Sequence, residues 1–218
     1  MSPFPQQLID GYRSFASQRL PTEQSRYREL SVRGQSPEVM VIGCCDSRVS
    51  PEVIFDAGPG ELFVMRNVAN LVPVYAPDSG AHGVSAALEY AVNALRVKHV
   101  VVLGHAQCGG IRAFIDKIEP LSPGDFIGRW MSMFVKPGEK VEQRDHETMA
   151  DFTVRIEKAA VFRSMENLMT FPFVQAAVAR GDLQLHGAYF GVAEGSLFVL
   201  DPAAKEFRGV REMQQAGG

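Results

Sequence analysis

Three short apolar runs alternate with longer segments along the first half of the chain. The runs cover residues 39–42, 61–65 and 99–103, and runs of this length predict buried strands. Between the second and third run, residues 79–96 repeat apolar positions at helical spacing, and Ser79 is a suitable N-cap for that helix. Strands joined by helices rather than by two-residue turns predict crossover connections and a parallel sheet.

The remaining segments predict further helices and a hairpin. Helical patterns cover residues 5–18, about 22–30, 51–55, 111–117, 126–134, about 144–168 and 171–181. Apolar stretches at residues 183–192 and 197–200 flank a turn at residues 194–196, which predicts an antiparallel hairpin. We interpret the last dozen residues as a loose tail.

Together these elements predict an α/β fold. We expect a mostly parallel central sheet flanked by helices, an antiparallel C-terminal edge strand or hairpin, and an N-terminal helical arm. No linker, internal repeat or low-complexity segment interrupts the sequence, so residues 1–218 are expected to form a single domain. The arm comprises residues 1–34, and its amphipathic helix could pack on its own domain or lie across a partner subunit.

Composition narrows the classes of function. Hydrophobic residues make up 46% of the chain and charged residues 22%, which is ordinary for a globular protein. The formal net charge is −3, whereas nucleic acid or an anionic membrane would require a basic patch, so we expect neither as a partner. The chain has no apolar run of about 18 residues and no signal-peptide core near its start, so we expect a cytoplasmic location.

Side chains with metal-binding chemistry follow two of the predicted strands. Cys44 comes two residues after the first run, and His105 and Cys108 follow the third. Sites in parallel sheets form beyond the carboxyl ends of the strands, so we expect these three side chains to meet. Thiolates and imidazole are preferred zinc ligands, and three protein ligands leave a fourth position open in a catalytic site. The sequence therefore predicts a catalytic zinc site.

A carboxylate and a guanidinium, those of Asp46 and Arg48, follow Cys44 within four residues. A free carboxylate here can accept a hydrogen bond from zinc-bound water or hydroxide, or swing in as a fourth ligand and close the site. Arg48 is placed to pair with Asp46 bidentately and hold it away from the metal. Two thiolates offset the charge of zinc, so we expect a bound water to be less acidic than under three imidazoles, and activity to rise with pH.

Each of these residues also has a plain structural interpretation. A cysteine after a strand is usually core and an aspartate–arginine pair is usually a structural ion pair, but their conjunction at matched strand ends favours the functional interpretation. Cys45 is adjacent to Cys44 and should point away from the metal, so we interpret it as a small buried residue. The other histidines lack ligand-like spacing and are interpreted as surface or hydrogen-bonded residues: His82, His99, His146 and His186.

The motifs resemble those of the β-class carbonic anhydrases. Residues 44–48 match the pattern Cys-x-Asp-Ser-Arg, residues 105–110 match His-x-x-Cys-Gly-Gly, and residues 59–70 match the segment between them. The resemblance implies a zinc lyase that hydrates carbon dioxide reversibly to bicarbonate and a proton by attack of zinc-bound hydroxide. It also implies that the three predicted ligands hold one zinc ion per chain and that the Asp46–Arg48 pair is the catalytic dyad.

The resemblance further implies an assembly and a substrate pocket. Family members form at least homodimers, with the N-terminal helices embracing the partner, and often tetramers or larger assemblies. Plant-like members, whose zinc is always open, line the pocket with Gln, Phe and Tyr. In this chain Gln35, Phe63 and Tyr90 fall at the matching positions, with Val68 and Gly109 beside them. Gln35 could donate a hydrogen bond to a substrate oxygen, and the apolar residues would make a dry cleft, although each is more often simple core.

Another branch of the family closes its zinc with the aspartate and binds regulatory bicarbonate through a Trp, an Arg and a Tyr. Here those positions hold Val41, Arg66 and Phe190, so we expect an open zinc and no such regulatory site.

Two alternatives to carbon dioxide hydration stay open. Relatives hydrolyse carbonyl sulfide or carbon disulfide, although the pocket residues favour carbon dioxide. A non-catalytic zinc-stabilised module could bind an anion or a protein, although the intact Asp46–Arg48 pair argues for catalysis.

Overall fold

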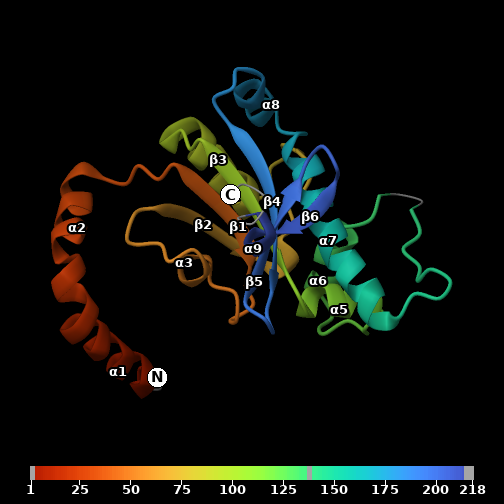
Figure 1. Cartoon of the computed structure of the whole chain (residues 1–218), viewed down its shortest axis with the longest axis horizontal. Coiled ribbons are helices and arrows are strands. Elements are labelled where there is room, and N and C mark those ends of the chain that lie inside the picture. The colour runs from red at the N-terminus through yellow and green to blue at the C-terminus, as the bar shows by residue number, and fades with distance from the viewer. Residues whose placement is uncertain (1–2, 137–138, 214–218) are drawn as a thin grey trace.

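A central β-sheet organises the computed structural model, which describes residues 3–136 and 139–213 (Figure 1). Within these ranges the sheet has six strands in the order β2-β1-β3-β4-β5-β6. Their bounds are β1 (Val39–Cys44), β2 (Leu62–Asn67), β3 (His99–His105), β4 (Gln184–Gly191), β5 (Ser196–Asp201) and β6 (Glu206–Gly209). Strands β1 to β4 pair in parallel, whereas β5 and β6 pair antiparallel at one edge. The predicted fold class is confirmed.

Helical segments flank the sheet and form the arm. They are α1 (Gln6–Ser14), η1 (Phe15–Arg19), α2 (Leu20–Arg33), α3 (Pro51–Ile54), η2 (Val68–Asn70), α4 (Gly83–Glu89), η3 (Tyr90–Leu95), α5 (Gly109–Ile115), α6 (Phe126–Ser132), α7 (Met149–Leu168), α8 (Pro172–Ala179) and α9 (Val210–Met213). The arm of α1, η1 and α2 projects from the body of the molecule (Figure 1), and these three segments contribute no buried residue. Across the described ranges, no helix has both the length and the apolar character that crossing a membrane requires.

The two faces of the sheet are covered unequally. Side chains alternate along a strand, so Met40 and Ile42 of β1 lie on one face and Val41 lies on the other. The first two belong to the main core, together with buried residues of α4, α7 and α8. Val41 belongs to a smaller cluster, in which Leu103 and Ala188 are buried and the surrounding apolar residues are only partly buried. The second face therefore has the thinner cover.

Two helices begin later than their patterns predict. Helix α4 begins at Gly83, so Ser79 is not its N-cap. The reason is local, because Asp78 accepts a hydrogen bond from the Gly80 N–H at 2.6 Å and so stabilises a turn instead of a helix. Helix α7 begins at Met149 rather than near residue 144, and the Thr148 hydroxyl caps it by accepting the Asp151 N–H at 3.1 Å.

The C-terminal tail is partly ordered, which corrects the prediction of a loose end. Strand β6 pairs with β5 along its length, from Gly209 opposite Phe198 to Glu206 opposite Asp201. The Phe207 ring lies edge-on to the ring of Tyr189, with 6.2 Å between centroids. Aromatic packing thus fixes a strand that the sequence pattern did not reveal. Residues 214–218 lie outside the described residues.

Candidate metal centre

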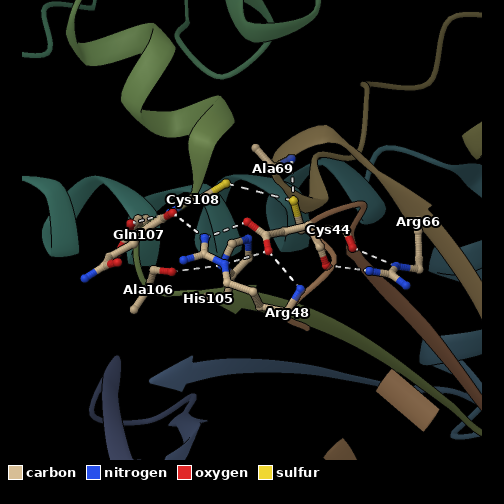
Figure 2. A network of polar contacts seen from close by, with 10 residues as sticks. Cys44, Arg48, Arg66, Ala69, His105, Ala106, Gln107 and Cys108 are labelled. Carbon is tan, nitrogen blue, oxygen red and sulfur yellow. Dashed lines mark hydrogen bonds and ion pairs between the residues drawn. The ribbon is translucent and has the colours of Figure 1, made fainter. Parts of the chain in front are cut away.

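The three predicted ligands meet at the carboxyl ends of β1 and β3. The register pairs Gly43 with Leu103, so Cys44 and His105 reach the same edge of the sheet, and Cys108 is the N-cap residue of α5. The sulfur atoms of Cys44 and Cys108 are 4.0 Å apart and face one another in Figure 2. All three ligand atoms lie within 4.8 Å of one another. The side chains are 5%, 1% and 2% exposed in chain order, so the cluster is buried.

This donor set fits a zinc ion. Zinc–sulfur bonds of about 2.3 Å in a tetrahedral site place two sulfurs roughly 3.8 Å apart, close to the separation of Cys44 and Cys108. The His105 Nδ1 donates to the Ala106 carbonyl at 2.9 Å, which leaves the Nε2 lone pair free. That Nε2 atom is buried and has no hydrogen-bond partner among the described residues. A buried polar atom without a partner is rare, and a bound metal would satisfy it.

Electrostatics at the cluster also favour a cation. Contact with Cys108 lowers the pKa of the Cys44 thiol, whereas the same contact and burial raise the pKa of Cys108. Burial acts to lower the pKa of His105, but the neighbouring Cys44 thiolate outweighs it and raises that pKa overall. One thiolate therefore forms easily and the second is repelled by the first. A dication would remove this repulsion, and binding it would release protons.

A tight turn after β2 fixes the environment of Cys44. The Ala69 N–H donates to the Cys44 sulfur at 3.4 Å. Ala69 and Asn70 have positive φ angles of 63° and 48°, a conformation that costs free energy for residues other than glycine. The Asn67 side chain holds the turn, because its amide donates to the Leu71 carbonyl and accepts the Leu71 N–H, both at 2.9 Å. These bonds keep a backbone donor aimed at the ligand sulfur.

Asp46 and Arg48 form a bidentate ion pair beside the ligands. The Arg48 Nε donates to Oδ1 of Asp46 at 2.9 Å and its Nη2 donates to Oδ2 at 2.7 Å. The Arg48 N–H adds a third bond to Oδ1 at 3.0 Å. Hydrogen bonding to Arg48 holds the pKa of Asp46 well below its usual range. The carboxylate therefore stays ionised and oriented near neutral pH.

The structure gives Arg66 a role in the backbone around this pair. Its Nε donates to the Cys44 carbonyl at 2.8 Å and its Nη2 donates to the Asp46 carbonyl at 2.7 Å, as the right of Figure 2 shows for Cys44.

Cys45 lies between Cys44 and Asp46 in the chain. The prediction that it is buried is wrong, because its side chain is exposed. Strand β1 ends at Cys44 and the Cys45 N–H donates to the Asn67 carbonyl at 2.9 Å, so the strand alternation no longer decides its orientation.

One buried residue of the site, Glu157, lies outside the sequence motifs. Glu157 of α7 is 2% exposed, and its Oε1 accepts the Cys108 N–H at 2.9 Å. Its Oε2 accepts the Tyr189 hydroxyl at 2.7 Å. Burial raises the pKa of the Glu157 carboxyl. The available signal was its position one turn before Val161 on the buried stripe of α7, where a glutamate is out of place.

The predicted pocket residues divide into two groups. Val68 and Gly109 lie next to the site, since they precede Ala69 and follow Cys108 in the chain. Phe63 lies farther away. It pairs with Met40 of β1, and Met40 precedes Cys44 by four strand positions, so Phe63 lies about 13 Å from the level of Cys44 along the sheet.

Tyr90 and Gln35 lie with Phe63 rather than with the ligands. The Tyr90 ring packs on the Phe63 ring, with 5.9 Å between centroids, and is 51% exposed. Gln35 is exposed in the segment before β1. One chain therefore does not bring these three residues to the ligands, and the prediction that they line the pocket stays a prediction.

The remaining histidines lie outside the centre. His82 contacts Asp78 at 2.7 Å, and His146 is exposed. The Nδ1 of His99 and the Nε2 of His186 are 3.1 Å apart. All four are surface or hydrogen-bonded residues, as predicted.

The fold and the site together define a class of protein. The chain is an α/β protein in which two cysteines and one histidine form a cluster that could hold a metal ion, at the carboxyl edge of a parallel sheet. Three ligands leave a tetrahedral metal one position for a reactant. The Asp46 carboxylate, paired with Arg48, lies close to this cluster.

The chain belongs to the carbonic anhydrase family, whose sequence profile, described as "Carbonic anhydrase", matches residues 39–197. A carbonic anhydrase of Pseudomonas aeruginosa is 35% identical over 205 residues, which cover 94% of this chain and 91% of that protein. The solved structure of the β-carbonic anhydrase CcaA matches with a TM-score of 0.84 at 27% identity, covering 94% of this chain and 91% of that one. A tetrameric β-carbonic anhydrase of the filamentous ascomycete Sordaria macrospora matches with a TM-score of 0.76 at 28% identity, over 89% and 95% of the two chains.

These findings confirm a β-class carbonic anhydrase and thus an enzyme, a lyase. The family indicates hydration of carbon dioxide, and zinc dependence is general in it. The cluster of Cys44, His105 and Cys108 supplies a group that could hold the metal.

Proposed function

We propose that this chain hydrates carbon dioxide reversibly to bicarbonate and a proton, with one zinc ion held by Cys44, His105 and Cys108. The strongest support is the donor set, in which two buried sulfurs 4.0 Å apart share a site with an imidazole nitrogen that has no hydrogen-bond partner in the described part of the chain. A zinc ion there would lower the pKa of a water molecule that it binds and so supply hydroxide for attack on carbon dioxide.

Asp46 and Arg48 are proposed to orient that attack. The Asp46 carboxylate accepts three hydrogen bonds from Arg48 and still has lone pairs to accept one from the attacking water or hydroxide. Arg48 also donates to the Gln107 carbonyl at 3.0 Å, which anchors the guanidinium on the far side of the site. Anchored in this way, Arg48 would keep Asp46 away from a bound metal ion. This arrangement supports the open-zinc, plant-like branch.

The residues at the regulatory positions support the same branch. Val41 is buried in the sheet and Phe190 carries no hydroxyl. Both guanidinium contacts of Arg66 go to backbone carbonyls of the site. An arginine already used to hold the backbone, with neither the Trp nor the Tyr beside it, favours the absence of a regulatory bicarbonate site.

We propose a homodimer as the minimal unit, within a tetramer or larger assembly. The arm exposes large apolar side chains that a partner would cover: Phe4, Leu8, Tyr12 and Tyr27. In such a dimer Gln35, Phe63 and Tyr90 of one copy would line the pocket beside the ligands of the other. The similar Sordaria macrospora proteins are described as tetrameric. Three free cysteines, two of them proposed zinc ligands, suit a reducing compartment such as the cytoplasm.

Stopped-flow hydration of carbon dioxide by zinc-quantified protein tests the proposal, with wild type beside Asp46→Asn. We expect wild type to turn over carbon dioxide and Asp46→Asn to keep its zinc while losing about 10- to 100-fold in kcat, the usual range for groups that support a metal site. Parallel assays with carbonyl sulfide and carbon disulfide should give little turnover. A fully zinc-loaded wild type without hydration activity would contradict the proposal and favour a non-catalytic module.

A further inference from the structure

A single peptide group joins the metal ligands to the Asp46–Arg48 pair. The carbonyl of Gln107 accepts the Arg48 Nη2 at 3.0 Å, and the N–H of Cys108, in the same peptide, donates to Glu157 Oε1 at 2.9 Å. The C=O and N–H of a trans peptide point in opposite directions, so Arg48 and Glu157 hold this peptide from opposite sides. Figure 2 shows the Gln107 carbonyl facing the Arg48 guanidinium.

The orientation of this peptide is not the one that the chain prefers locally. Gln107 has a φ of 56°, in the left-handed region that favours glycine. Such a conformation persists only where surrounding contacts impose it. Rotation of the peptide would break the bonds to Arg48 and to Glu157 together. Whatever fixes the Cys108 N–H therefore also fixes the anchor of Arg48.

Glu157 is well suited to impose that orientation. Its carboxylate is almost fully buried, on the twenty-residue helix α7 that packs against β3 and β4. The Tyr189 hydroxyl donates to its second oxygen at 2.7 Å, and Tyr189 is itself only 4% exposed. Both oxygens are therefore held, one by the site and one by strand β4.

We propose that Glu157 is a positioning residue for the hydration reaction, acting through the Gln107–Cys108 peptide. This rests on the proposed function. By fixing the peptide, Glu157 holds the Cys108 backbone at the metal and holds Arg48 against Asp46. Tyr189 supports it by fixing the second carboxylate oxygen. Glu157 acts on the reaction through other groups, and the contacts that carry its effect are hydrogen bonds from neutral backbone and hydroxyl donors.

Three variants separate this role from simple stability. Glu157→Gln keeps an amide oxygen that can accept the Cys108 N–H, and its amino group can donate to Tyr189. Glu157→Leu removes the acceptor at similar volume, and Tyr189→Phe removes only the support. Ile156→Val is the matched control, because Ile156 is buried next to Glu157 on α7 and makes no polar contact with the site.

Steady-state kinetics per bound zinc, with ¹⁵N amide spectra of the zinc-loaded protein, give the decisive readouts. We expect Glu157→Leu to lower kcat by about 10- to 100-fold with KM changed less than about threefold, and Glu157→Gln to recover most of that loss. Tyr189→Phe should lower kcat by a smaller factor, and Ile156→Val should leave it unchanged. The backbone amide resonance of Cys108 and the Nε–H resonance of Arg48 should shift in Glu157→Leu and Tyr189→Phe and stay near their wild-type positions in Glu157→Gln.

Two results would overturn the proposal. One is a wild-type kcat per zinc in Glu157→Leu; if that variant does not fold, wild-type kcat and wild-type Cys108 and Arg48 resonances in Tyr189→Phe count in the same way. The other is an equal loss in Glu157→Gln and Glu157→Leu, because Gln preserves the acceptor. An inactive wild type would reject the proposed function instead, and the amide shifts would still test the positioning role.

Discussion

Two regions of the molecule differ in how complete they are within one chain. One is the carboxyl edge of the sheet with Cys44, His105 and Cys108, called the metal end below, and the other is the aromatic pair of Phe63 and Tyr90. At the metal end, the proposed ligands from two strands and a loop are buried, and each of these residues makes a hydrogen bond that helps to hold it. Tyr90, by contrast, is half exposed and the pair lies about 13 Å back along the strands. One chain therefore brings the three proposed ligands together by itself, whereas the proposed substrate lining would require a second copy.

The largest expected effect tests the completeness of the metal end. Cys44→Ser should reduce bound zinc below about a tenth per chain and abolish hydration, because a serine hydroxyl is a poor replacement for a thiolate ligand. Cys45→Ser is the matched control, one residue away and exposed, and it should keep zinc and activity. Metal analysis and stopped-flow assays measure both. Zinc loss in Cys45→Ser would mean that the ligand set is misassigned.

A mixed dimer tests the dependence of the aromatic end on a second copy. Gln35→Ala changes an exposed side chain, so it should keep zinc and assembly while hydration falls by about tenfold or more. In a dimer of one Cys44→Ser chain and one Gln35→Ala chain, the intact metal site would face the intact Gln35. Such dimers, purified with two different tags, should recover about half the wild-type activity, since one of the two symmetric sites is whole. Activity no higher than that of the Gln35→Ala parent would show that Gln35 does not act across the dimer.

A conservative change at Arg48 tests whether this residue holds Asp46 in position at the metal end. Lysine cannot form a bidentate pair with a carboxylate. Arg48→Lys would therefore lose the paired hydrogen bonds to Asp46 and the hydrogen bond to the Gln107 carbonyl. We expect zinc to be retained and kcat to fall by about tenfold or more. A crystal structure of this variant should show Asp46 displaced from its wild-type position. An unchanged kcat would mean that Arg48 does not hold Asp46 for the reaction.

The pH dependence of activity gives the smallest expected effect. Arg48 keeps the pKa of Asp46 well below its usual range, so this carboxylate is ionised at every pH from about 5 upward and its titration cannot shape the profile there. A rise in kcat between neutral and alkaline pH would then report loss of the proton from water at the metal, as expected with two thiolate ligands. A profile that is flat over this range would contradict the interpretation.

The sequence was most informative where local rules act. Valine-rich runs before Cys44 and His105 predicted the strands, and the geometry of parallel sheets then predicted that the ligands meet. The prediction failed for Cys45, because the strand ends one residue earlier and loop contacts decide its orientation. Ser79 failed as an N-cap because the Asp78 side chain stabilises a competing turn. Glu157 was not found because it lies 49 residues from Cys108 and is linked to it by a backbone N–H that no motif records.

A crystal structure of the zinc-loaded protein near neutral pH, with anomalous data at the zinc edge, tests the central claim most directly. We predict zinc at about 2.3 Å from the sulfurs of Cys44 and Cys108 and about 2.0–2.1 Å from Nε2 of His105. The Asp46 carboxylate should remain on Arg48, away from the metal. An Asp46 oxygen within about 2.2 Å of zinc, or zinc bound at other residues, would contradict an open centre built by these three ligands.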